Sequence, residues 1–180
     1  MPVLLQNRQR AVAVNCAWLG RTAEAVLAAA HVESAELSLV LVSDRRMRTL
    51  NQRYRKKDRT TDVLAFPMHE IWPSKRRSPA PAASLGPRTR PGASGAGGCD
   101  IAKSRLSRVP MVLGDVVISM PTAKRQAAEL GHSLRDEVAR LLVHGVLHLL
   151  GYDHERSERD ALLMARKEKA VLRAIRGKGN

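Results

Sequence analysis

Residues 144–154 read His-Gly-Val-Leu-His-Leu-Leu-Gly-Tyr-Asp-His. His144 and His148 are one helical turn apart, so both imidazole rings project from the same face of a helix. Gly151 allows the chain to leave that helix in a left-handed conformation, and the turn after it can bring His154 back toward the first two rings. Three neutral imidazoles that converge with one coordination position open form a catalytic zinc site. We therefore predict that these three histidines bind one metal ion. Zinc is the first choice, and nickel or copper would also suit imidazole ligands.

A glycine at position 145 distinguishes this stretch from a class of zinc peptidases. Metzincin peptidases share the spacing His-x-x-x-His-x-x-Gly-x-x-His, but they carry a glutamate directly after the first histidine as general base. Gly145 stands at that position here, so peptide hydrolysis would lack its proton acceptor. The small size of Gly145 also predicts open space beside the metal, where a bulky substrate backbone could lie.

Hydrophobic patterning on either side of the histidines predicts an α+β domain. Strands are predicted at Val3–Arg8, Glu36–Val42, Thr61–Phe66 and Met111–Ser119. Helices are predicted at Cys16–Ala30, after the cap residues Ser43 and Asp44, from Pro121 to about Gly131, from Ser133 to about Leu150, and over about residues 156–175.

The composition of residues 72–110 differs from the rest of the chain. This stretch holds six of the nine prolines, a Gly-Ala-Ser run, and eight basic residues against one acidic residue. Such a segment cannot bury enough apolar surface to offset its ordering entropy. We therefore predict one domain made of residues 1–71 and 111–176, a disordered basic insertion at 72–110, and a flexible tail at 177–180.

The overall charge indicates the class of partner. The 180 residues include 31 Lys+Arg and 17 Asp+Glu, which gives a formal net charge of +14. A surplus of this size favours polyanions such as nucleic acid or anionic membranes, without choosing between them. Aromatic residues make up only 3% of the chain, which is too few for a protein that binds single strands mainly by base stacking.

Cysteine content and hydropathy indicate the compartment. Cys16 and Cys99, the two cysteines, have no partner at ligand spacing and are expected to be free thiols, which argues against a secreted disulfide scaffold. No apolar run approaches the roughly 18–20 residues that a membrane span needs, and the apolar start of the chain is too short for a signal peptide. We expect a cytoplasmic protein with no membrane partner.

Three blocks of the sequence together resemble the YbeY family of bacterial metallo-endoribonucleases, also called rRNA maturation factors. The histidine stretch is similar to the family signature. Leu50-Asn-Gln-Arg-Tyr-Arg-Lys-Lys-Asp-Arg-Thr-Thr-Asp-Val-Leu-Ala-Phe-Pro67 is similar to L-N-x-x-Y-R-x-x-D-x-P-T-D-V-L-S-F-P, and Leu113-Gly-Asp-Val-Val-Ile-Ser119 to L-G-D-I-V-I-S/C. Thr60 and Ala65 depart from the usual proline and serine. Residues 72–110 stand where the family usually has a short connection.

The resemblance implies a fold, an activity and partners. The fold would be a small mixed β-sheet of about four strands flanked by helices, with a zincin-like helix that carries the metal-binding histidines. The activity would be cleavage of single-stranded RNA in 16S rRNA 3′-end maturation and ribosome quality control. Expected partners are rRNA or other single-stranded RNA, and the ribosome or ribosomal proteins, with no DNA partner.

The resemblance also assigns roles to residues outside the histidine stretch. The family's key arginine matches Arg55, so Arg55 and His144 are the expected catalytic residues. Arg55 lies in a basic cluster with Lys56, Lys57 and Arg59, and a guanidinium can hold a phosphate bidentately. Phosphate binding is therefore expected of all four residues, although Lys56 and Lys57 could instead belong to a solvated surface. Asp153 could orient a metal-binding histidine from behind, or it could be a turn residue.

Several alternatives remain open at this point. The nucleophile could be water or the RNA 2′-OH. The protein could be a non-catalytic ribosome-assembly or RNA-binding factor with a structural metal, or a metal-dependent hydrolase of another substrate. Asp62 and Asp115 are expected to accept structural hydrogen bonds, and His132 to belong to the turn before the histidine helix.

Overall fold

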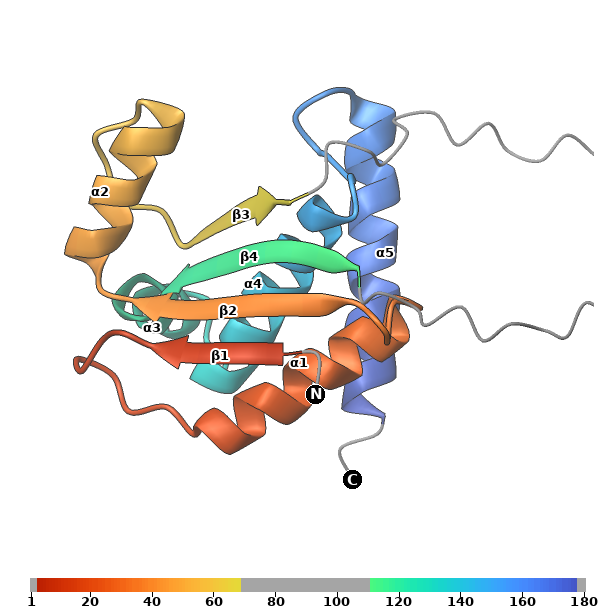
Figure 1. Cartoon of the computed structure of the whole chain (residues 1–180), viewed down its shortest axis with the longest axis horizontal. Coiled ribbons are helices and arrows are strands. Elements are labelled where there is room, and N and C mark those ends of the chain that lie inside the picture. The colour runs from red at the N-terminus through yellow and green to blue at the C-terminus, as the bar shows by residue number, and fades with distance from the viewer. Residues whose placement is uncertain (1–2, 69–110, 178–180) are drawn as a thin grey trace, which may run out of the picture. The chain divides into compact units, whose positions relative to one another are not determined.

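A computed structural model of the chain describes residues 3–68 and 111–177. These contain four strands, β1 (Val3–Asn7), β2 (Glu36–Val42), β3 (Val63–Pro67) and β4 (Val112–Ser119). They also contain five helices, α1 (Cys16–Ala29), α2 (Asp44–Arg55), α3 (Met120–Glu129), α4 (Leu134–Leu149) and α5 (Glu158–Arg176) (Figure 1). The predicted α+β class is confirmed, with only small shifts at the ends of elements. The predictions for residues 72–110, which include Cys99, fall outside the described residues.

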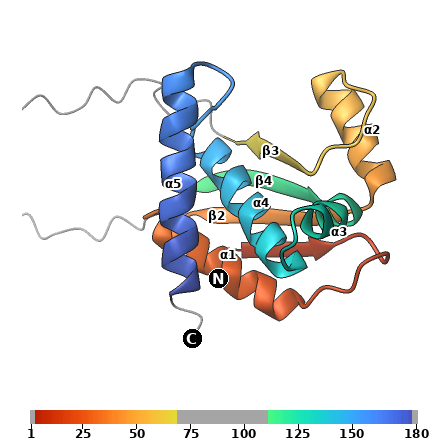
Figure 2. The same cartoon turned by 180° about the vertical axis from the view of Figure 1, so that it is seen from behind.

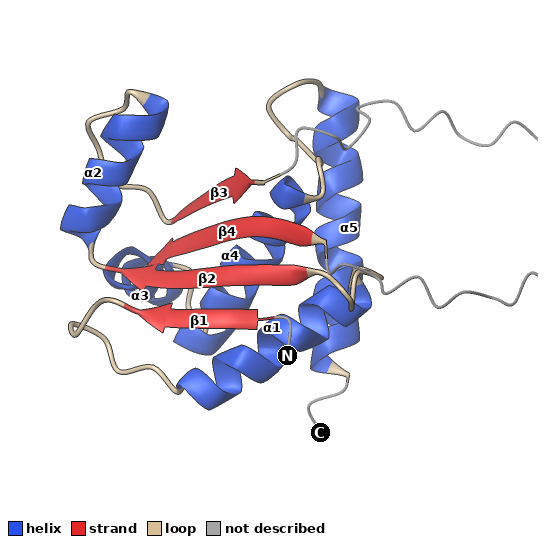
Figure 3. Cartoon of the chain, in the orientation of Figure 1, coloured by secondary structure: helices blue, strands red, loops and turns tan. Residues whose placement is uncertain are grey.

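The four strands form one mixed sheet in the order β1-β2-β4-β3 (Figure 3). β1, β2 and β4 run parallel, and α1 provides the crossover that the parallel pair β1 and β2 requires. β3 pairs antiparallel with β4, from Val63 opposite Ile118 to Pro67 opposite Gly114. Among the strands of residues 3–68 and 111–177, β3 is therefore an edge strand, paired with β4 alone.

The main core lies between one face of the sheet and the helices α1, α4 and α5, which Figure 2 shows in front of the sheet. Alternate residues of β2, among them Leu39 and Leu41, point to this face and are fully buried. Leu142 and Val146 of α4 face them with no exposed surface. α4 is therefore the central helix of the domain, and its position fixes where its histidines lie.

A smaller apolar cluster lies on the other side of the sheet. Met47 of α2 packs there with Val42, Leu64 and Val117, and the half-buried Phe66 packs against the cluster. This contact holds α2 beside the edge strand β3. Within the part of the chain that the structure covers, no helix combines the length and apolarity that crossing a membrane would require.

Candidate metal centre

The local sequence fixes how α4 begins and ends. The Ser133 hydroxyl accepts a hydrogen bond from the Asp136 backbone N–H, which caps the helix start. At the other end, the N–H groups of Gly151 and Tyr152 donate to the carbonyls of His148 and Leu147. These two bonds form a Schellman motif, which needs a left-handed residue, and Gly151 has φ +84°. The predicted left-handed exit from the helix is therefore present.

The structure brings all three predicted metal ligands together. One ring nitrogen from each of His144, His148 and His154 lies within 4.8 Å of the others. The Nε2 atoms of His144 and His148 are 3.0 Å apart. Nitrogens that bind zinc tetrahedrally at about 2.0–2.1 Å would be about 3.3 Å apart, so the observed spacing fits a shared metal ion.

A carboxylate from α5 orients the first of these rings. Glu168 Oε1 lies 2.6 Å from Nδ1 of His144. Because a carboxylate can only accept a hydrogen bond, Nδ1 carries the proton and Nε2 keeps a free lone pair. That lone pair faces His148, as metal binding requires. Metal-binding histidines usually have such a partner on the second ring nitrogen.

Sequence reasoning missed Glu168 and selected Asp153 for this task. The Asp153 carboxylate instead accepts hydrogen bonds from the Glu155 backbone N–H at 2.9 Å and from Arg156 Nε at 3.0 Å. The bond from Glu155, and then the charge of Arg156, lower the pKa of Asp153. Among the residues described, no hydrogen bond joins Asp153 to a histidine ring. Both carboxylate oxygens accept hydrogen bonds from the loop before α5. Asp153 therefore has the contacts of a turn residue, which is the second of the two roles considered for it above.

The surroundings of His148 favour the neutral ring. Burial lowers the pKa of His148, and the neighbouring His144 and His154 lower it further, against the opposing charge of Asp153. A neutral imidazole is the form that binds a metal ion. The environment therefore prepares His148 as a ligand.

Arg55 reaches the same site from α2. It is the last residue of that helix, and Lys56 after it is left-handed with φ +57°. Arg55 Nη2 lies 3.3 Å from Glu155 Oε1 in the loop between α4 and α5. Both side chains are partly exposed, so the pair contributes little stability.

A cavity of about 750 Å³ joins Arg55 to the three histidines. Its lining includes the edge strand β3, the end of α2, the end of α4 and the loop that leads to α5. Figure 1 shows these elements around β3. Of the four predicted phosphate-binding residues, Arg55 lines the cavity. Lys56, Lys57 and Arg59 are exposed and are not part of its lining.

Two further cavity residues carry charge and were not predicted. Glu155 and Arg156 both line it, and both follow His154 directly in the sequence. Their position next to His154, a predicted metal ligand, is the sequence signal that could have identified them. Arg156 places a second guanidinium in the cavity that holds Arg55.

The structure adds a packing role to Gly145. A Cβ atom at this position would lie 2.7 Å from Cγ1 of Val116 and 3.4 Å from Cγ2 of Val63. Glycine therefore allows α4 to pack closely on β3 and β4. Gly145 also lines the cavity that contains the three histidines.

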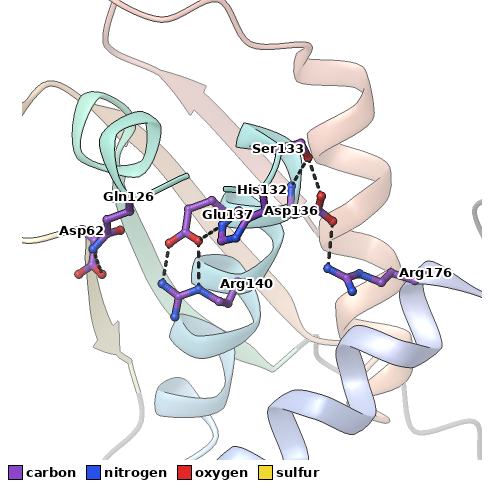
Figure 4. A network of polar contacts seen from close by, with 8 residues as sticks. All are labelled: Asp62, Gln126, His132, Ser133, Asp136, Glu137, Arg140 and Arg176. Carbon is purple, nitrogen blue, oxygen red and sulfur yellow. Dashed lines mark hydrogen bonds and ion pairs between the residues drawn. The ribbon is translucent and has the colours of Figure 1, made fainter. Parts of the chain in front are cut away.

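A second polar cluster lies nearer the start of α4 (Figure 4). Glu137 is fully buried and accepts hydrogen bonds from Arg140 at 2.6 Å and from the His132 ring at 2.7 Å. Burial alone would raise the pKa of Glu137, but these hydrogen bonds hold it below its usual value. His132 lies in the turn before α4, as predicted.

The two aspartates expected to be structural differ in their surroundings. Asp62 accepts hydrogen bonds from the Val63 N–H, the Thr61 hydroxyl and the Gln126 amide. The carboxylate of Asp115 accepts no hydrogen bond from any residue that the structure describes. Asp115 pairs with Ser38 and Phe66 in the sheet.

Comparison with known proteins places the chain in a family. The family model described as endoribonuclease YbeY matches residues 4–176. The chain belongs to the YbeY family. A protein of Pelotomaculum thermopropionicum named endoribonuclease YbeY is 44% identical over 176 residues, which cover 96% of this chain and 95% of that protein. Its namesake in Aquifex aeolicus is 42% identical over 150 residues, or 83% of this chain and 77% of that protein.

A solved structure supports the fold. The solution structure of a Thermotoga maritima protein superposes with a TM-score of 0.59 at 21% sequence identity, and the match covers 98% of this chain and 90% of that one. At this identity the likeness concerns the fold alone. The YbeY resemblance seen in the three sequence blocks is confirmed by the family match.

Proposed function

We propose that this YbeY-family chain is a single-strand-specific, metal-dependent endoribonuclease that acts in the cytoplasm on 16S rRNA 3′-end maturation and ribosome quality control. The observation that supports this most is one cavity lined by three converging histidines and by Arg55. The relatives named as endoribonucleases make RNA the expected substrate. In this proposal the domain made of residues 1–71 and 111–176 cleaves the RNA.

His144, His148 and His154 would hold the metal, and we propose zinc. Neutral imidazoles suit zinc, and three protein ligands leave a position open for chemistry. When bound, zinc supplies a Lewis acid that polarises a phosphodiester oxygen or lowers the pKa of water toward neutrality. The hydrogen bond that His144 Nδ1 donates to Glu168 keeps the His144 ring in the tautomer that this binding needs.

Arg55 would bind the scissile phosphate. Its guanidinium lines the cavity with the histidines, and it stabilises the charge that builds up on phosphate oxygens during cleavage. Three exposed basic residues would bind rRNA phosphates on either side of the scissile one, with the ribosome as the expected setting. These residues are Lys56, Lys57 and Arg59. The phosphate at the ends of the cleaved RNA would identify the nucleophile. Attack by the 2′-OH leaves a cyclic phosphate, whereas attack by water leaves a linear one.

The packing of Gly145 disfavours a peptidase. A glutamate at this position would collide with Val116, so the general base of the metzincins has no place here. We expect generic single-stranded RNA to be cut and generic peptides to stay intact, with both reactions assayed with and without chelator. Peptide cleavage with intact RNA would overturn the proposal.

A non-catalytic role in ribosome assembly is the other alternative. His144→Ala and Arg55→Glu separate it, because these changes remove a proposed metal ligand and the proposed phosphate contact. If either variant folds, binds rRNA and still supports 3′-end maturation, catalysis is not the main role. We expect both variants to lose maturation.

A further inference from the structure

The few aromatic residues of the chain are concentrated at the cavity. The sequence has two Trp, two Tyr and one Phe. Three of the four within residues 3–68 and 111–177, Tyr54, Phe66 and Tyr152, line the cavity that contains the histidines. The fourth, Trp18, lies on α1. The chain as a whole is therefore poor in aromatic residues, but the lining of this cavity is not.

Tyr54 differs from the other two in its exposure. It is 56% exposed at the end of α2, whereas Tyr152 is partly buried against the main core. Phe66 supports Tyr54 from β3, with ring centroids 4.9 Å apart and an interplanar angle of 63°. Phe66 is itself packed on the cluster of Met47 and Leu64. Tyr54 is thus an exposed ring on a firm support.

Positive charge lies directly beside this ring. Arg55, the next residue, lines the same cavity. The Arg53 guanidinium lies over the face of the Tyr54 ring, with its carbon 5.6 Å from the ring centroid. A ring face that accepts a planar guanidinium can also accept a planar base, and the neighbouring Arg55 suits the phosphate of the same nucleotide.

We propose that Tyr54 is a base-stacking platform: one unpaired nucleobase of the RNA stacks on its ring while Arg55 binds an adjacent phosphate. This inference rests on the proposed function and adds the source of its strand preference. A base within a duplex is already stacked on both faces, so it cannot use the platform. A single platform next to the cleavage site needs only one exposed ring, which agrees with the low aromatic content.

Paired changes in the protein and in the RNA test this contact. Tyr54→Leu keeps an apolar side chain over Phe66 but removes the aromatic face, and Tyr54→Phe keeps the ring. The holoenzyme would be assayed on a single strand of about ten nucleotides, and on copies in which one base at a time near the cleavage site is removed. Trp18→Leu is the matched control, because it removes an aromatic ring outside the cavity.

The expected result is a coupling between Tyr54 and one base. Tyr54→Leu lowers kcat/KM on the intact strand about tenfold or more, while Tyr54→Phe and Trp18→Leu stay within about twofold. One abasic position lowers the wild-type kcat/KM similarly, and on that strand Tyr54→Leu cuts as well as the wild type. The stacking proposal would be overturned if Tyr54→Leu and removal of the base lowered kcat/KM independently, so that their effects multiplied. It would also be overturned if Tyr54→Leu cut the intact strand as well as the wild type. Either result would leave the proposed endoribonuclease activity standing. A wild-type protein that cuts no RNA would overturn both.

Discussion

The His144 ring donates a hydrogen bond to a carboxylate on another helix. Glu168 is 23% exposed and accepts from Nδ1 at 2.6 Å, while Nε2 faces the other ligands. Glu168 lies four residues after Met164 and three before Val171, the two buried residues of α5. A carboxylate in the core-facing stripe of a helix is unusual, and this spacing is the signal by which the sequence could have revealed it.

Glu168→Gln is expected to weaken metal binding. The amide keeps the shape of the side chain but loses the charge that makes the His144 ring a better donor to the metal. Loss of such a partner typically lowers metal affinity about 10–100-fold. Titration of the metal-free protein with Co²⁺, followed by visible absorption, measures this without any activity assay.

Glu158→Gln, on the exposed start of α5, is the matched control and should leave the affinity unchanged. Equal affinities for Glu168→Gln and the wild type would show that Glu168 does not position the ring. His144 and His148 were predictable because helix spacing determines their direction, and His154 because the glycine turn after the helix can bring it back toward them. Tertiary packing brings Glu168 and Tyr54 to the site, so the local pattern could mark Glu168 as unusual in its helix without showing that it contacts His144.

At the scale of secondary structure elements, the close packing of α4 on the sheet depends on Gly145. The helix approaches β4 so closely that an added Cβ would lie 2.7 and 3.1 Å from the two methyl groups of Val116. Contacts this short force the helix or the strand to move. Any such shift would displace His144 from β3 and the rest of the cavity.

Gly145→Ala is therefore expected to destabilise the protein by about 1–3 kcal/mol through overpacking, despite the better helix propensity of alanine. Gly20→Ala is the matched control, since the added Cβ of Gly20 in α1 would meet no described atom within 4 Å beyond its chain neighbours and its own helix backbone. That change should stabilise by about 0.5–1 kcal/mol. Urea unfolding measures both.

A double-mutant cycle with Val116→Ala identifies the cause. Gly145→Ala should cost less in the Val116→Ala background, because the smaller side chain leaves room for the new methyl group. Equal costs in both backgrounds would place the strain elsewhere. The sequence predicted α4 and β4 as elements from their patterning. It did not predict this contact or the antiparallel edge position of β3, because strand order depends on packing between distant segments.

At the scale of the whole molecule, stability includes a buried charge. Glu137 has no exposed surface, and Arg140 and His132 satisfy its oxygens. Its folded pKa lies below the ordinary value of 4.5. A carboxyl with a depressed folded pKa stabilises the protein above its unfolded pKa, and this contribution is lost as the pH falls through the folded pKa.

Glu137→Gln is thus expected to lower the free energy of unfolding by about 2 kcal/mol at pH 7. The difference from the wild type should begin to shrink as the pH falls below about 4.5, where the carboxyl of the unfolded chain takes up a proton, and should be lost once the pH is below the lower folded pKa. Urea midpoints at pH 7 and at about pH 3 test the sign. The exposed Glu129→Gln serves as control, and a difference that does not change with pH would refute the role of the Glu137 charge.

The folded structure sharpens what the net charge of +14 indicates about the partner of the protein. The charge predicted only a polyanionic partner, and half of it belongs to residues 72–110. The described domain adds a cavity in which Arg55 and three histidines meet, so the polyanion becomes a substrate in the proposed function.

The most direct test is RNA cleavage by native, metal-stripped and reconstituted protein. The stripped protein should lose cleavage of single-stranded RNA, and one equivalent of Zn²⁺ per chain should restore it, with no restoration in His144→Ala. Undiminished cleavage by protein that elemental analysis shows to be free of metal would contradict the account.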